Sequence, residues 1–299
     1  LTLRSHNSGL NLNEPVAPIP GKSPVWSQDP STIFTNLTDG AKVFVHGACS
    51  SPVTLISMLY QYGMEKGLKN ITVNHMLPLG PLPYLNEEAK GTFRLNTAYS
   101  SNLCRDAINS GQADFTPISV SEIPLLYRKK HVNMDYALIT FFSFECSLGN
   151  LCRDAINSGQ ADFTPISVSE IPLLYRKKHV NMDYALITVT PPDKHGFCSL
   201  GAGVGTARSA IQNAQKIIGQ VNPMSPVSYG DGTIHCSKID FFVHGPEKLQ
   251  EILPPQATQT EQKIAKIIAE NLVEDGATIQ LGFGRIPYEV TNQLRGHRD

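Results

Sequence analysis

The sequence has little that would indicate a metal site, a disulfide framework or a membrane segment. Its six cysteines are scattered over 299 residues, and Cys104 and Cys152 are copies of one position. No Cys-x-x-Cys pair and no cysteine–histidine spacing typical of zinc is present. Free thiols in a reducing compartment are the simplest interpretation. No apolar run approaches the roughly 20 residues that span a bilayer, so we predict neither a metal nor a membrane span.

The charge is also nearly balanced. The formal net charge is -1, and no long segment is rich in lysine and arginine. This argues against nucleic acid or an anionic membrane as the main partner. With 41% hydrophobic residues, the chain can build one large domain or two smaller ones.

One stretch is present twice without a difference, over residues 102–140 and 150–188. It reads NLCRDAINSGQADFTPISVSEIPLLYRKKHVNMDYALIT. Natural repeat arrays diverge, and packing does not demand identity at surface positions. We therefore interpret it as a recent duplication or an exon counted twice. The second copy joins directly to VTPPDKHGFCSLG, so we expect it to occupy the native position and residues 102–149 to be the insertion.

Short apolar runs alternate with helix-like segments, which predicts an α/β fold with a parallel sheet. The expected strands are VFV, ITV, ADFTPIS, MDYALIT and IIGQVNP, and the expected helices include NLCRDAINSG and SEIPLLYRKK. We assign residues 1–28 to a lead-in, 29–243 to a first domain, 244–260 to a linker and 261–299 to the start of a second domain.

The second domain is predicted to open with a capped helix. Thr258 and Glu261 fit a capping box, and four apolar residues that follow share one face: Ile264, Ile267, Ile268 and Leu272. ATIQLGFG should then form a strand that ends in glycines.

The two ends suggest part of a longer protein. The chain begins at Leu1 rather than Met, and its last helical pattern is followed by no strand. The opening LTLRSHNSGLNLN has one arginine and no acid before Glu14, which fits the end of a mitochondrial targeting sequence. A disordered terminus is the alternative.

The glycine cluster LGAGVGTARS, residues 200–209, does not fit a dinucleotide site. Its glycines follow a GxGxG pattern rather than GxGxxG, and no acidic residue closes the following strand to bind a ribose. We interpret it as a backbone turn that approaches a neighbouring loop or a ligand.

The segment QLGFGRIPYEV, residues 280–290, is the sharper signal, because its glycines precede a helix N-terminus that could hold an anion or an oxyanion. A turn without a ligand is the alternative. Asp193 with His195, and Ser169 with Glu170, are expected to be structural, the latter pair as a helix start.

Taken in order, ADFTPISVSEIPLLYRKK, ALITVTPPDKHGFCSLGAGV, IIGQVNPMSP, GDGTIH and QLGFGRIPYEV resemble the acetyl-CoA hydrolase/transferase family. The lead-in is most similar to the animal mitochondrial branch, which acts on 4-hydroxybutyrate or on acetate and succinate. The resemblance implies a two-domain CoA-transferase-like fold of the NagB/RpiA type, with the second domain incomplete here. It implies transfer of coenzyme A between an acyl-CoA and a small carboxylic acid, with the thioester as substrate and no bound cofactor.

The resemblance also implies specific residues. The family's CoA-contacting loop corresponds to Gly282, Phe283, Gly284, Arg285 and Ile286. The family's nucleophile is a glutamate, expected just beyond Asp299, and Glu289 does not match its motif. The resemblance therefore implies that this chain has no catalytic residue and is inactive. An acetyl-CoA hydrolase and a non-catalytic, mis-assembled product are the alternatives. A mitochondrial location, with the cytoplasm as alternative, and a homo-oligomer are further implications.

Overall fold

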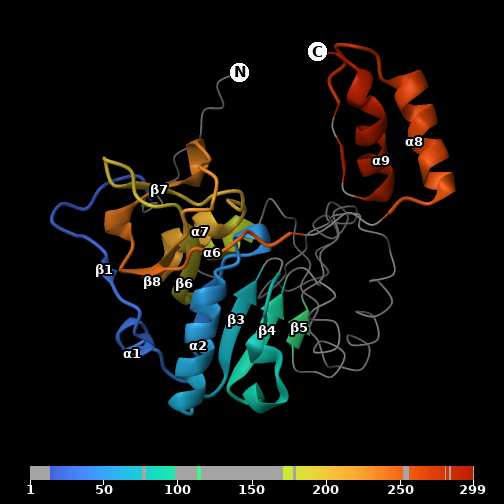
Figure 1. Cartoon of the computed structure of the whole chain (residues 1–299). Helices are drawn as coiled ribbons and strands as arrows, with labels where there is room; N and C mark the ends of the chain where they lie inside the picture. Colours follow the sequence, from blue (N-terminus) through green and yellow to red (C-terminus); the bar gives the residue numbers. More distant parts are fainter. Residues whose placement is uncertain are drawn as a thin grey trace, which may run out of the picture. The chain divides into compact units, whose positions relative to one another are not determined.

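The computed structural model describes residues 14–75, 79–97, 113–115, 171–177, 180–251, 256–279, 281–282 and 284–298. The chain divides into two compact units (Figure 1). The first comprises residues 1–141 and 151–250, and the second comprises residues 142–150 and 251–299. No helix within the described ranges is long and apolar enough to cross a membrane.

The first unit is built on an eight-stranded sheet in which every described pairing is parallel. The strand order is β1-β10-β8-β6-β2-β3-β4-β5. Their bounds are β1 Val25–Trp26, β2 Lys42–Val45, β3 Ile71–His75, β4 Phe93–Thr97, β5 Ala113–Phe115, β6 Met182–Val189, β8 Ala214–Val221 and β10 Phe241–His244. An antiparallel pair, β7 Phe197–Ser199 and β9 Thr233–His235, lies outside this sheet.

The predicted α/β fold is confirmed, and its apolar runs are strands because both faces of the sheet are covered. Side chains alternate between two buried clusters, with Val43 and Leu186 in one cluster and Phe44 and Ile187 in the other. Helix α2, Val53–Glu65, connects β2 to β3 and buries Leu55, Ile56 and Leu59 in the first cluster.

Shorter helices complete the first unit. These are α1 Pro30–Ile33, α6 Ile171–Arg176 and α7 Ala207–Asn213, with 3-10 turns η1 Ala48–Ser50, η2 Pro83–Leu85, η3 Glu87–Ala89, η5 Gly230–Gly232 and η6 Cys236–Lys238. Asp29 caps α1 by accepting hydrogen bonds from the backbone N–H groups of Ser31 and Thr32, at 3.0 and 3.1 Å.

The two copies of the repeat both contribute to the sheet. Strand β5 comes from the first copy and pairs with β4, whereas α6 and β6 come from the second. The expectation that residues 102–149 are the insertion stays a prediction, because residues 161–163, which correspond to Ala113–Phe115 in the second copy, lie outside the described residues. The predicted helix NLCRDAINSG lies outside the described residues in both copies.

The second unit contains α8, Gln259–Leu272, α9, Arg285–Gln293, and the turn η7, Leu294–Gly296. The predicted capping box is confirmed, with the Glu261 N–H donating to Thr258 Oγ1 at 3.3 Å and the Thr258 N–H to Glu261 Oε2 at 2.6 Å. Helix α8 buries Ala265 and Ala269, whereas Ile267 is 60% exposed.

The strand expected at ATIQLGFG is not present, since residues 277–279 and 281–282 are irregular. A strand needs a neighbouring strand to satisfy its backbone groups. The described residues of the second unit include no strand that could pair with this segment.

Candidate functional site

In the first unit, the loops that follow the parallel strands all lie at the carboxyl ends of those strands. From the central strand β2 the chain moves outward to β3, β4 and β5, while β6, β8 and β10 extend the sheet in the other direction. Open α/β sheets bind ligands outside the carboxyl ends of the strands, where the strand order reverses. The loops that follow β2 and β6 are therefore where a site is expected in this unit.

His46 stands at this point, directly after β2, and is only 2% exposed. Its Nδ1 accepts a hydrogen bond from the Thr188 N–H on β6 at 3.4 Å. The ring proton is therefore on Nε2, which donates to the carbonyl oxygen of Gly203. Burial lowers the pKa of His46 to about 4, partly opposed by the bond to Gly203, so the imidazole is neutral at pH 7. It joins β2, β6 and the glycine cluster.

The glycine cluster is a turn that packs closely on neighbouring loops, as predicted. A Cβ atom at Gly203 would lie 2.6 Å from Ser50 Oγ and 3.1 Å from His46 Nε2. Gly201 has a φ of +70°, and a Cβ there would lie 2.3 Å from Ser225 Oγ. The glycines are needed because any side chain would collide with the loops after β2 and β8.

Several buried polar atoms at this edge hydrogen-bond to no described residue. They are Ser50 Oγ on the loop after β2, Thr188 Oγ1 on β6, Ser225 Oγ on the loop after β8 and His75 Nδ1 on β3. Buried polar atoms are normally paired, so these four are exceptions among the described residues, and Ser50 Oγ and Ser225 Oγ lie against the glycine turn. Burial lowers the pKa of His75 to about 3, and its Nε2 is hydrogen-bonded to the Tyr84 hydroxyl.

The second unit holds the loop predicted to contact coenzyme A. Gly284, with a φ of 135°, precedes α9, so the N–H groups of Arg285 and Ile286 in the first helical turn have no partner within the helix. Pro287 follows and has no N–H to offer. Gly282 is exposed, and Phe283 lies outside the described residues.

The other candidates have local roles or lie outside the described residues. The Asp193 carboxylate accepts from the N–H groups of His195 at 2.8 Å and Phe197 at 2.9 Å, so the pair forms a turn. These bonds, the one from Phe197 first, lower the pKa of Asp193. Glu289 accepts from Asn292 and Gln293 of its own helix. Ser169 and Glu170 lie outside the described residues.

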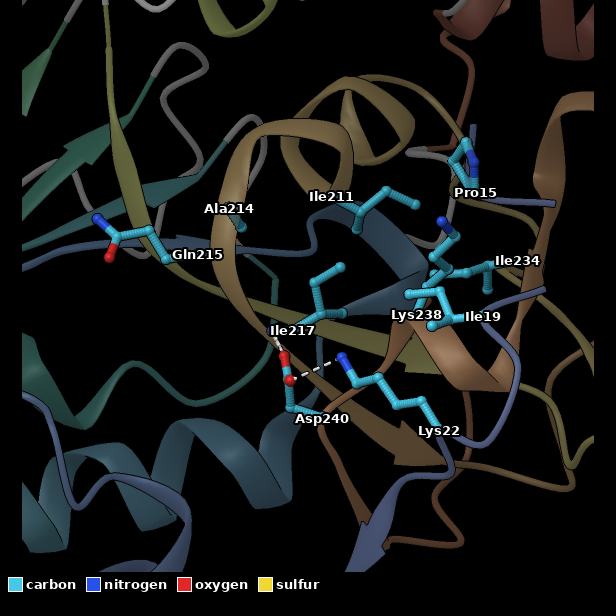
Figure 2. A pocket seen from close by; sticks show the side chains of 10 residues that line it. All are labelled: Pro15, Ile19, Lys22, Ile211, Ala214, Gln215, Ile217, Ile234, Lys238 and Asp240. Carbon is cyan, nitrogen blue, oxygen red and sulfur yellow. Dashed lines mark hydrogen bonds and ion pairs between the residues drawn. The ribbon is translucent and has the colours of Figure 1, made fainter. Parts of the chain in front are cut away.

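A hollow lies at the other end of the strands, near the amino ends of β8 and β10 (Figure 2). Ile211, Ile217 and Ile234 form part of its wall, and an ion pair of 3.0 Å joins Lys22 to Asp240 at its side. Because α/β ligand sites form at the carboxyl edge, this hollow is not the candidate site.

The sequence interpretation missed His46, Ser50 and His75. The available signal was their place in the chain, since His46 and Ser50 follow the predicted strand VFV and His75 ends the one that begins ITV. Polar residues at such positions face the ligand edge of a parallel sheet. His195, in contrast, lies in an exposed turn.

The comparisons with known proteins agree with this architecture. The acetyl-CoA hydrolase/transferase N-terminal domain family matches residues 26–144 and again residues 141–254, so each match contains one copy of the repeat. The chain is 41% identical to the succinyl-CoA:acetate/propanoyl-CoA:succinate CoA transferase of Fasciola hepatica, covering 96% of this chain and 49% of that protein. It is 41% identical to the 4-hydroxybutyrate coenzyme A transferase of Clostridium kluyveri, covering 86% and 48%.

Two solved structures share the fold. The 4-hydroxybutyrate CoA-transferase of Porphyromonas gingivalis has a TM-score of 0.61 at 24% identity, covering 92% of this chain and 52% of that one. RipA of Yersinia pestis has a TM-score of 0.64 at 20% identity, covering 90% and 53%. The chain thus spans about half the length of the relatives it matches. The chain belongs to the acetyl-CoA hydrolase/transferase family.

Proposed function

We propose that this chain is the amino-terminal part of an enzyme that transfers coenzyme A between an acyl-CoA and a small carboxylic acid. The observation that carries the proposal is the family match over residues 26–254, together with 41% identity to two CoA transferases. Acetate, succinate, propionate and 4-hydroxybutyrate are the proposed acids. An acyl-CoA thioester is the substrate, and no bound cofactor is required.

The proposed chemistry proceeds through a covalent enzyme intermediate. A glutamate carboxylate attacks the thioester carbonyl and releases CoA thiolate, which leaves an acyl-glutamyl anhydride. The thiolate then attacks the glutamyl carbonyl, giving a glutamyl-CoA thioester and the free acid. The acceptor carboxylate reverses these steps, so kinetics are ping-pong. We place this glutamate beyond Asp299, which makes the chain inactive by itself.

The residues of this chain would bind and orient the substrate. The N–H groups of Arg285 and Ile286, at the start of α9, are suited to hold an oxyanion or a part of coenzyme A. The ion pair between Arg285 and Glu261, at 3.6 Å, fixes the first turn of α9 to α8.

The test compares this chain with the same chain extended past Asp299 through the expected glutamate. We expect acetyl-CoA:succinate exchange with ping-pong kinetics from the extended protein and none from residues 1–299. Robust turnover by residues 1–299 would overturn the position of the nucleophile. No exchange by a folded extended protein would overturn the transferase proposal.

An acetyl-CoA hydrolase is the second candidate, because the family name includes hydrolases. Adding succinate separates the two, since a transferase consumes acetyl-CoA much faster with an acceptor and a hydrolase does not. We also propose a mitochondrial location and a homo-oligomer. Import of the extended protein into isolated mitochondria, and its mass in solution by light scattering, test these two points.

A further inference from the structure

Residues 245–250, the first part of the predicted linker, lie against the carboxyl edge of the sheet. The Gly245 N–H donates to the Val221 carbonyl at 3.2 Å, and the Gly245 carbonyl accepts from Gln220 Nε2 at 3.2 Å. The Gln250 N–H donates to the Cys49 carbonyl at 3.3 Å. A free linker would leave these backbone groups to water, whereas here several are paired with the sheet and its loops.

Asn222 makes the central contact with this segment. Its Nδ2 donates to the Glu247 carbonyl at 2.7 Å, and its Oδ1 accepts from the Glu247 N–H at 3.2 Å. The same Oδ1 also accepts from the Met224 N–H at 3.0 Å. Asn222 is itself anchored, being 3% exposed, with its N–H donating to the Val189 carbonyl at 2.8 Å. One side chain therefore pairs both backbone groups of Glu247, as a neighbouring strand would.

The Glu247 side chain adds a second attachment, since it accepts a hydrogen bond from the Thr54 hydroxyl at the start of α2. The neighbouring Leu55 N–H donates to Gln220 Oε1 at 3.2 Å. The start of α2, the end of β8 and Glu247 thus form one connected network. Buried networks in which the members are paired hold a single arrangement of the chain.

The far end of the segment lies beside the candidate site. Gln250 is bonded to the carbonyl of Cys49, the residue before Ser50. Its side chain packs over Gly80, where a Cβ atom would lie 3.0 Å from Gln250 Oε1. Fixing Glu247 therefore fixes Gln250 next to the loop that follows β2.

We propose that Asn222, Thr54 and Glu247 form a latch that holds residues 245–250 against the carboxyl ends of the strands and keeps Gln250 beside the loop that follows β2. The segment then belongs mechanically to the first unit rather than to a free linker. The latch depends only on contacts within this chain, so a test of the latch does not depend on whether the proposed reaction is correct.

Limited trypsin digestion of the whole chain tests the latch, because Lys248 is exposed and lies between Glu247 and Gln250. Asn222→Asp keeps the shape but replaces the Nδ2 donor with a carboxylate that repels the Glu247 carbonyl. We expect cleavage after Lys248 to accelerate about tenfold, since cleavage follows local opening. Cleavage after Lys22, on the other side of the unit, should be unchanged.

Asn213→Asp is the matched control, because Asn213 donates to the Ser209 carbonyl at 2.8 Å far from the linker. It should leave cleavage after Lys248 as in the wild type. Thr54→Val removes only the bond to the Glu247 carboxylate and should give a smaller acceleration, which decides the question if Asn222→Asp does not fold. Equal rates for Thr54→Val and Asn213→Asp, or a parallel rise at Lys22, would overturn the latch.

Discussion

His46 donates its Nε2 hydrogen to the carbonyl oxygen of Gly203, and so joins the loop after β2 to the glycine turn that precedes α7. The bond from the Thr188 N–H to Nδ1 fixes the tautomer that makes this donation possible. The loops on the two sides of the switch point are therefore held together by one neutral imidazole. This contact organises the candidate site of the first unit.

Removing the imidazole should destabilise the first unit. His46→Leu leaves the Gly203 carbonyl and the Thr188 N–H buried without their partner. We expect a loss of about 2–4 kcal/mol in the free energy of unfolding, measured by urea titration. His244→Leu, at an exposed position, is the control and should change it little. A His46→Leu variant as stable as the control would contradict the role of the imidazole.

Lowering the pH from 7 to 5 should reduce the free energy of unfolding, at pH values where most carboxylates are still ionised. In the unfolded chain a histidine has a pKa of about 6.5, whereas burial lowers the pKa of His46 to about 4 and of His75 to about 3. Between these values the unfolded state binds more protons, so the stability present above roughly pH 6.5 is lost as pH falls toward 4.

The combined loss from pH 7 to pH 5 should be on the order of 4 kcal/mol, read from urea titrations at each pH. The double variant His46→Gln, His75→Gln should be less stable at pH 7 and nearly flat over that range. An equally steep dependence in the double variant would assign the effect to other groups.

Gly203→Ala should lower the free energy of unfolding, and a smaller residue at position 50 should reduce that loss. The added Cβ would lie 2.6 Å from Ser50 Oγ and 2.9 Å from its Cβ, so we expect a loss of about 1–3 kcal/mol in unfolding free energy. Combining it with Ser50→Gly should recover part of that loss, which a double-mutant cycle measures. Gly296→Ala, with open space around it, is the control. Strictly additive effects would contradict a direct collision.

The two described glycines of the predicted CoA loop should differ in their tolerance of alanine. Gly284 has a φ of 135° and a ψ of 173°, which side-chain-bearing residues rarely adopt. Gly284→Ala should reorganise the start of α9, cost about 1–3 kcal/mol and weaken CoA binding measured by calorimetry. Gly282 has open space and no such backbone conformation, so Gly282→Ala should leave stability unchanged. Equal stability of the two variants would show that the strained turn is not required.

The parallel sheet could be predicted because its strands are short apolar runs buried on both faces. The predicted runs VFV and MDYALIT became β2 and β6, and the capping box of Thr258 and Glu261 formed as its residue types require. The ATIQLGFG strand failed, because periodicity cannot tell whether a partner strand is present. Which copy of the repeat is the insertion stays a prediction, since identical copies carry no information on which one enters the sheet.

The candidate site also has features that the sequence predicted and features that it did not. The close approach of the glycine turn was predicted from its glycine cluster, and the structure shows it at Gly201 and Gly203. Its partners were not, because Ser50 and His46 are distant in sequence and only the strand order brings them to the turn. The role of Gly282, Gly284, Arg285 and Ile286 in CoA binding stays a prediction.

The sequence by itself determined the α/β class, the family and the capped helix, since each depends on local residue types or on long ordered motifs. Only the tertiary structure decided that the buried, neutral imidazole of His46 joins two loops and that Asn222 binds Glu247. Those contacts join segments far apart in the chain. They exist because parallel strands place their carboxyl ends, and the loops that follow, at one edge of the sheet.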